Sequence, residues 1–132
     1  ACKVYPAPFD VRLPAPGRSA DSEIYTVVQP DLCIVCDLAK LDERGCLGAP
    51  DLIIEILSPS TAQKDVTEKY HLYEQSGVRE YWIADPANET LLPFTLGEDG
   101  RYSASKLLSK SERVQSHFLP RLHLKIEEVF AE

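Results

Sequence analysis

One strand, one helix and a second strand in the middle of the sequence constrain the fold most. Residues 52–57 (LIIEIL) are a short apolar run typical of a buried strand. Residues 64–77 (KDVTEKYHLYEQSG) have helical spacing, with Asp65 expected as the N-cap and Gly77 expected just past the last turn. Residues 79–85 (REYWIAD) read as the next strand. A crossover of this length predicts that the two strands lie parallel in one sheet.

The remaining segments add antiparallel pieces to this unit. We expect an edge strand containing prolines at 2–13, a strand bent at Pro30 over 24–37, a polar connector at 38–50, a hairpin formed by 90–96 and 101–108, and a short helix within 123–132. The predicted class is therefore α/β (α+β), with a mixed sheet in a single domain of residues 1–132.

Composition sets limits on function. The chain is 44% hydrophobic, enough for an ordinary core, and its net charge is −7. An acidic chain is a poor general nucleic-acid binder, although a bound divalent metal and a local basic groove can offset the charge. No apolar run approaches the roughly 20 residues that span a bilayer, so no membrane association is expected. No secretory signal opens the chain, and a cytoplasmic location with reduced thiols is predicted.

Four cysteines include the pair Cys33 and Cys36 in a CxxC motif. This motif can bind zinc or carry redox chemistry. Because it lies in a predicted strand, its two side chains point to opposite faces, and we interpret them as structural residues. Zinc binding by Cys33, Cys36 and Cys46 is the less favoured alternative.

Glu55 is the unusual residue of the buried strand. An ionised carboxylate buried without partners costs several kcal/mol, so its presence calls for a cation or a reaction that uses it. The structural alternatives are a salt bridge to Lys69 or Arg79, or a strand with one exposed face.

Neighbouring segments favour a metal site. Asp31 opens the strand of the preceding element, and pairing of the two strands would bring its carboxylate to Glu55. Two carboxylates are typical protein ligands for Mg²⁺. Asp65 and Lys69 lie one helical turn apart, and two opposite charges at this spacing usually form a solvent-exposed ion pair. A lysine directed into a carboxylate cluster can instead stabilise charge on a phosphate.

Several stretches together resemble the Uma-type restriction endonuclease family of the PD-(D/E)XK nuclease-like superfamily. They are PFDVRL, QPDLCIVCD, GAPDLIIEILSPST and YEQSGVREYWIADP, with an aspartate and a lysine at 65 and 69. The resemblance implies a restriction-endonuclease-like mixed sheet flanked by helices. It also implies a Mg²⁺ (or Mn²⁺) site, DNA as substrate, and a lysine that organises the attacking water.

Geometry selects among the matching residues. Asp51 and Glu55 lie on one strand, ~13 Å apart, too far for both to bind one metal. Asp31 is therefore the better partner of Glu55, and Asp51 and Asp65 are weaker candidates. Leu57 stands where the superfamily has its lysine. We interpret Lys69 as the migrated lysine.

The family carries about fifty further residues, with a helix and a strand, before the matching region. We therefore expect that this chain lacks the N-terminal part of the family domain, and that exposed apolar surface favours a homo-oligomer such as a dimer. The leading hypothesis is a Mg²⁺-dependent DNA endonuclease with Asp31, Glu55 and Lys69 as catalytic residues. The alternative is a non-catalytic binding or assembly domain on the same fold.

Overall fold

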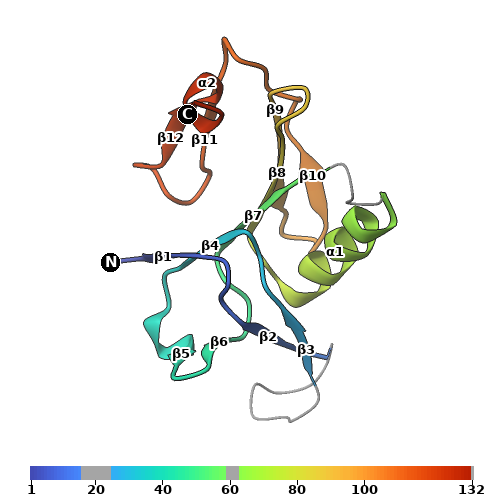
Figure 1. Ribbon diagram of the computed structural model, residues 1–132. Helices are drawn as coiled ribbons and strands as arrows, with labels where there is room; N and C mark the ends of the chain where they lie inside the picture. The colour runs from blue at the N-terminus through green and yellow to red at the C-terminus, as the bar shows by residue number, and fades with distance from the viewer. Residues whose placement is uncertain (16–24, 59–62, 132) are drawn as a thin grey trace.

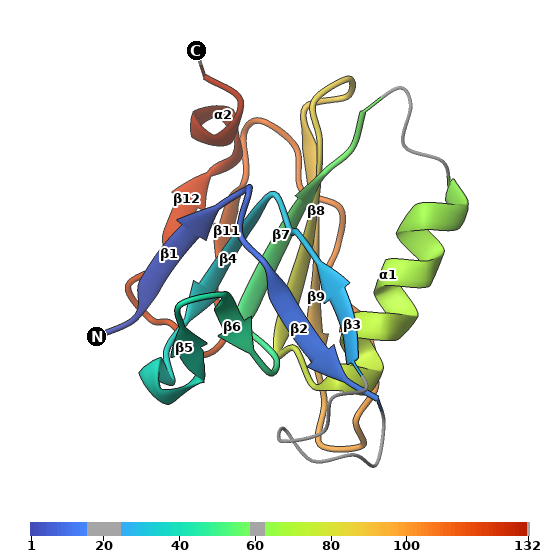
Figure 2. The ribbon, with the colours of Figure 1, turned by 60° about the horizontal axis from the view of Figure 1, so that its bottom comes forward.

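A six-stranded mixed sheet forms the centre of the computed structural model, which describes residues 1–15, 25–58 and 63–131, with helix side chains from Val66 onward. Its strands are β1 (Lys3–Pro6), β4 (Leu32–Val35), β7 (Leu52–Ile56), β8 (Glu80–Asp85), β9 (Thr90–Leu96) and β10 (Tyr102–Ala104), in the order β1-β4-β7-β8-β9-β10. Helix α1 (Gln63–Ser76) packs on one side of the sheet (Figures 1 and 2).

Smaller units flank the central sheet. A four-stranded sheet with the order β3-β2-β6-β5 is formed by the N-terminal part of the chain. Its strands are β2 (Val11–Pro14), β3 (Tyr25–Val28), β5 (Leu41–Asp42) and β6 (Gly45–Leu47), and the 3-10 helix η1 (Leu38–Lys40) precedes β5. The C-terminal unit contains β11 (Arg113–Gln115), β12 (His123–Lys125) and α2 (Ile126–Val129), and it lies on the side of the sheet opposite α1 (Figure 2).

The predicted crossover is confirmed. β7 and β8 pair in parallel, from Leu52 opposite Glu80 to Ile56 opposite Ala84, with α1 between them in sequence. Gly77 follows the helix with φ of 86°, the left-handed conformation that glycine adopts without a steric penalty. The predicted hairpin is also present as β9 and β10, and Pro30 lies between β3 and β4 as expected.

Other predicted boundaries are wrong. Residues 2–13 form two strands in different sheets, because the chain turns at the Ala7–Pro8 bond between β1 and β2. Residues 38–50 are not a plain connector, since β6 pairs in parallel with the distant β2. Asp65 lies inside α1 and is not its N-cap. The predicted C-terminal helix is shorter than expected, because residues 123–125 form β12.

Side-chain alternation along β7 divides the interior into two cores. Ile53 packs in the core on the α1 side with Tyr73 and Tyr81. Leu52 packs on the opposite side with Trp82, below the C-terminal unit. The start of β8 is held to the C-terminal segment through Glu80, a buried carboxylate that accepts hydrogen bonds from the Ser116 hydroxyl and the His117 amide. Both aromatic residues of β8, Tyr81 and Trp82, are buried.

A disulfide joins Cys2 to Cys36. The expectation that all thiols are reduced is therefore wrong for this pair. The prediction that Cys33 and Cys36 face opposite sides is confirmed, since Cys33 packs in the α1-side core and Cys36 against the other core. The bond fastens the start of β1 to the end of β4.

Some apolar surface remains exposed. A pocket of about 370 Å³ on the C-terminal side of the sheet is lined by apolar residues, and Ile56 and Val129 at its margin are exposed. In the described part of the chain, neither helix has the length and hydropathy needed to cross a bilayer.

Candidate active site

Pairing of β4 with β7 brings Asp31 and Glu55 together, as the sequence predicted. The two strands are antiparallel, with Leu32 opposite Ile54, so the next pair outward consists of these two acidic residues. The Asp31 amide donates to Glu55 Oε1 over 3.3 Å, and the Ile56 amide donates to Asp31 Oδ2 over 2.7 Å. The two carboxylates are therefore held by the end of the strand ladder itself.

Helix α1 contributes two further groups to Glu55. Lys69 Nζ lies 3.3 Å from Glu55 Oε2, and the Tyr73 hydroxyl donates to the same oxygen over 2.7 Å. Lys69 and Tyr73 are four residues apart, so they occupy one face of the helix. Lys69 was identified from the sequence, but Tyr73 was not. The signal that could have found it was its helical spacing from Lys69.

The environment of Glu55 opposes its ionisation. The side chain is 8% exposed, and this burial raises the pKa of Glu55 above its usual value. The Tyr73 hydrogen bond is the largest of the opposing effects, followed by the charge of Lys69. Of the two salt bridges considered from sequence, the one to Lys69 is present, whereas the Arg79 guanidinium lies over the Phe118 ring at 5.4 Å. The contacts with Tyr73 and Lys69 thus only partly compensate the Glu55 carboxylate for its loss of hydration, and a cation at this carboxylate would favour its charged form.

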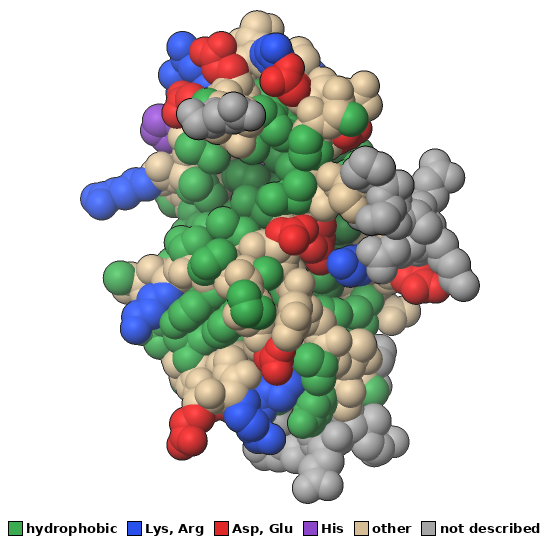
Figure 3. All heavy atoms as spheres, in the orientation of Figure 1, with side chains coloured by type: hydrophobic (Ala, Val, Ile, Leu, Met, Phe, Trp, Pro, Cys, Tyr) green, Lys and Arg blue, Asp and Glu red, His purple; other side chains and the backbone are tan. Residues whose placement is uncertain are grey.

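A pocket of about 390 Å³ opens beside these groups. Asp31, Glu55 and Lys69 all line it. Its other lining residues are Gln29, Ile56, Leu57, Ser58, Val66 and Tyr81. In the space-filling view, acidic side chains lie in the middle of the face with a basic side chain beside them (Figure 3). The pocket is large enough for a cation with its waters and one phosphate group.

The weaker candidates fall outside this arrangement. Asp51 lies immediately before β7, where its Oδ2 accepts a 2.7 Å hydrogen bond from the Cys36 amide. Asp65 is in the first described turn of α1, and its side chain is outside the described part of the structure. Leu57 lines the pocket but offers no polar group.

The cysteines do not form a zinc site. Cys36 is bonded to Cys2, while Cys33 and Cys46 are buried thiols. Burial raises the pKa of Cys33 to about 12 and that of Cys46 to about 11, so the thiolate form that binds zinc is disfavoured.

The donor set at Asp31 and Glu55 fits a hard divalent cation. Within residues 1–15, 25–58 and 63–131, no group of three or more His, Cys, Asp or Glu side chains converges on one point. Two carboxylates nevertheless match the usual protein contribution to a Mg²⁺ site, in which waters and phosphate oxygens complete the coordination.

Comparison with known proteins relates the chain to one protein family and to solved structures. Residues 2–127 match the Uma2 family, described as "Putative restriction endonuclease". The structure is similar to a crystal structure from Anabaena variabilis described as "a putative nuclease belonging to DUF820". The TM-score is 0.71 at 20% sequence identity, and the match covers 98% of this chain and 68% of that chain. This likeness confirms the predicted mixed α+β fold of the restriction-endonuclease-like type. A search of curated proteins gave no significant match.

Proposed function

Because the chain belongs to the Uma2 family of restriction-endonuclease-like proteins, we propose that it is a nuclease that hydrolyses DNA phosphodiester bonds with the help of a divalent cation. The observation that supports this best is the junction of β4 and β7. Two carboxylates meet there at the wall of a pocket, and a lysine contacts one of them. This combination provides oxygen ligands for a cation and a positive charge for a phosphate.

Asp31 and Glu55 are the residues that would hold the cation, with Mg²⁺ or Mn²⁺ as the expected ions. A bound divalent ion supplies Lewis acidity toward a phosphoryl oxygen and lowers the pKa of water. Asp31 is oriented for this role by the Ile56 amide, and Glu55 by Tyr73. Both carboxylates are thus fixed before any ion arrives.

Lys69 has the charge-stabilising role in this proposal. Its side chain is 29% exposed and lines the pocket, so its ammonium group can contact a phosphate while it remains near Glu55. A fixed positive charge in a partly desolvated site stabilises the negative charge that develops on the phosphate. The same group can orient a water molecule for attack.

A non-catalytic role on the same fold is the second candidate. It is favoured by the contacts that Glu55 already makes with Lys69 and Tyr73, because a structural ion pair would show the same contacts. The two proposals differ in metal binding. A structural pair has no need of a cation, whereas a catalytic pair must bind one.

The test is cleavage of supercoiled plasmid in Mg²⁺ or Mn²⁺, together with calorimetric titration of Mn²⁺. Glu55→Gln keeps the size of the side chain and should abolish both nicking and the metal-dependent heat. Glu80→Gln is the matched control, because Glu80 is also a buried carboxylate, on the neighbouring strand, and its partners lie in the C-terminal segment. The control should nick DNA like the wild type.

Two results would overturn the proposal. One is a wild-type protein that neither nicks DNA nor binds Mn²⁺. The other is a Glu55→Gln variant that cuts as fast as Glu80→Gln. Binding of the ion without cleavage would support metal binding by the two carboxylates and reject the nuclease activity.

A further inference from the structure

A second pocket lies directly beside the candidate active site. It has a volume of about 380 Å³, and its lining includes Tyr5, Phe9, Asp10, Gln29 and Arg44. Gln29 lines both pockets, so the two adjoin at this residue. A substrate bound at the first pocket would therefore extend toward the second.

The pairing of β1 shows which side of the sheet the second pocket shares with the candidate active site. It pairs with β4 so that Tyr5 lies opposite Cys33, and the Ala7 amide then donates to the Asp31 carbonyl over 3.0 Å. Cys33 is in turn opposite Ile53, which shares its face of β7 with Glu55. The aromatic residue of β1 thus lies on the same side of the sheet as the candidate metal ligands.

An aromatic pair forms one wall of the second pocket. The rings of Tyr5 and Phe9 are stacked, with centroids 4.2 Å apart and an angle of 4° between their planes. Both residues are half-buried, so their positions are fixed by the core while part of each ring remains accessible. A rigid, partly exposed aromatic surface is the element on which proteins stack unpaired bases.

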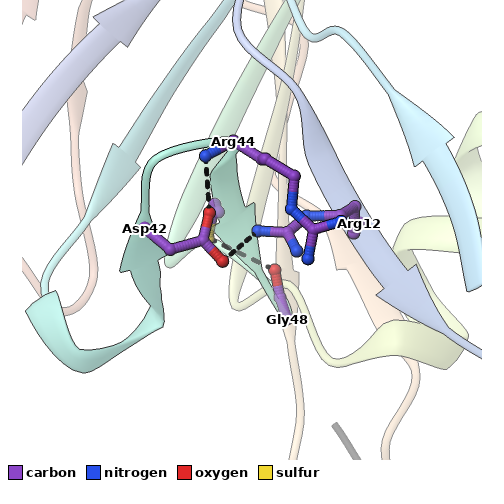
Figure 4. A network of polar contacts seen from close by, with 5 residues as sticks. Arg12, Asp42, Arg44 and Gly48 are labelled. Carbon is purple, nitrogen blue, oxygen red and sulfur yellow. Dashed lines mark hydrogen bonds and ion pairs between the residues drawn. The ribbon is translucent and has the colours of Figure 1, made fainter. Parts of the chain in front are cut away.

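The polar groups of this pocket suit a base better than a phosphate. The Gln29 amide donates to Asp10 Oδ1 over 2.7 Å, which presents an amide and a carboxylate together. Asp42 also lines the pocket and is bound by the Arg12 guanidinium and the Arg44 amide (Figure 4). Carboxylates repel phosphate but accept hydrogen bonds from the amino groups of bases.

We propose that this pocket holds one unpaired nucleobase of the DNA strand whose phosphate occupies the Asp31–Glu55 site. The inference rests on the proposed function, and it adds a substrate class: single-stranded DNA, or duplex DNA opened near the cut. A base inside an intact duplex is stacked on both faces and cannot enter a pocket unless it is extruded. The ring pair provides the stacking, and the amide and carboxylate beside it contact the edge of the base.

The experiment measures stacking without cleavage. A short single-stranded oligonucleotide that carries one 2-aminopurine is titrated with the protein in chelator and in Ca²⁺. Fluorescence quenching reports stacking of the analogue on an aromatic ring, and anisotropy reports binding. The variants are Phe9→Leu, which removes the ring, and Phe9→Tyr, which keeps it. Phe118→Leu is the matched control, because Phe118 is half-buried against the core on the opposite side of the sheet.

We expect wild type, Phe9→Tyr and Phe118→Leu to quench 2-aminopurine equally. Phe9→Leu should lose the quenching and bind the strand about tenfold more weakly, the usual effect of one lost stacking contact. An absence of quenching in the wild type would overturn the proposal. Equal effects of Phe9→Leu and Phe118→Leu would also overturn it, because they would indicate a general effect on folding.

Failure of the nuclease proposal gives a different pattern. In that case plasmid is not nicked and Glu55→Gln behaves as wild type, while the quenching at Phe9 persists. Conversely, metal-dependent nicking that disappears in Glu55→Gln but is accompanied by no Phe9-dependent quenching supports the nuclease and rejects the base pocket.

Discussion

The hydroxyl group of Tyr73 offers a quantitative test of how Glu55 is held. The ring is fully buried and packs edge-on against Tyr81 at 5.1 Å, so Tyr73→Phe keeps the packing and removes one oxygen. That oxygen donates to a buried carboxylate over 2.7 Å. A hydrogen bond to a charged group contributes about 1.5–3 kcal/mol, so the free energy of unfolding at neutral pH should fall by that amount.

A double-mutant cycle isolates the interaction. In a Glu55→Gln background the acceptor is a neutral amide, and loss of the same hydroxyl should cost only about 0.5–1.5 kcal/mol. The expected coupling energy is therefore about 1 kcal/mol. Tyr102→Phe is the control, since the Tyr102 hydroxyl donates to the neutral Val78 carbonyl and should show no coupling to Glu55.

The sign of the pH dependence follows from the same contact. Removal of the donor raises the pKa of Glu55 further, in addition to the rise caused by burial. The destabilisation by Tyr73→Phe should be complete above the pKa of the variant and should shrink as the carboxyl group becomes protonated. Urea unfolding in chelator, followed by the fluorescence of the single tryptophan at neutral and acidic pH, measures both effects. A coupling energy of zero at neutral pH would refute the reasoning.

Three further predictions concern stability. Gly45→Ala should lower the free energy of unfolding by more than about 2 kcal/mol, because φ at Gly45 is 124° and an added Cβ would lie 2.2 Å from a backbone oxygen. Gly77→Ala should lower it by only about 1 kcal/mol, because φ is 86° but the space around the added Cβ is open, and equal losses of the two variants in urea unfolding would contradict this. Reduction of the Cys2–Cys36 bond should lower the free energy of unfolding by about 4 kcal/mol, because the bond closes a loop between residues 34 positions apart and so restricts the unfolded chain. An unchanged melting temperature in dithiothreitol would argue against this. In the metal-free protein, Glu55→Gln should be more stable than wild type at neutral pH, because the raised pKa of Glu55 means that the wild type loses stability as this carboxyl group ionises with rising pH. A variant that is less stable than wild type at neutral pH would contradict this.

Much of the central unit could be predicted from sequence because its signals are local. Apolar runs of strand length, a helix with one apolar face and Gly77 after its last turn were sufficient for the crossover. Pairing of the strand after Asp31 with the strand that contains Glu55 was then enough to bring these two carboxylates together.

The features that were missed depend on long-range register. β5 and β6 are two and three residues long, too short for a period to be visible, and β6 is defined by its pairing with β2. The bond between Cys2 and Cys36 depends on how β1 aligns with β4, which no local pattern indicates. Tyr73 is a fully buried aromatic residue, and only the packing of α1 on β7 shows that its hydroxyl donates to Glu55.

Asp31 closes the ladder between two central strands with both its amide and its carboxylate. Amide hydrogen exchange at Asp31 and Ile56 should therefore report opening of this end of the β4–β7 pair. It follows that loss of Asp31 frays the sheet and removes the candidate ligand in one step. An inactive Asp31→Ala protein would consequently be ambiguous in a genetic screen, whereas an inactive Glu55→Gln protein that keeps its exchange protection would identify the chemistry.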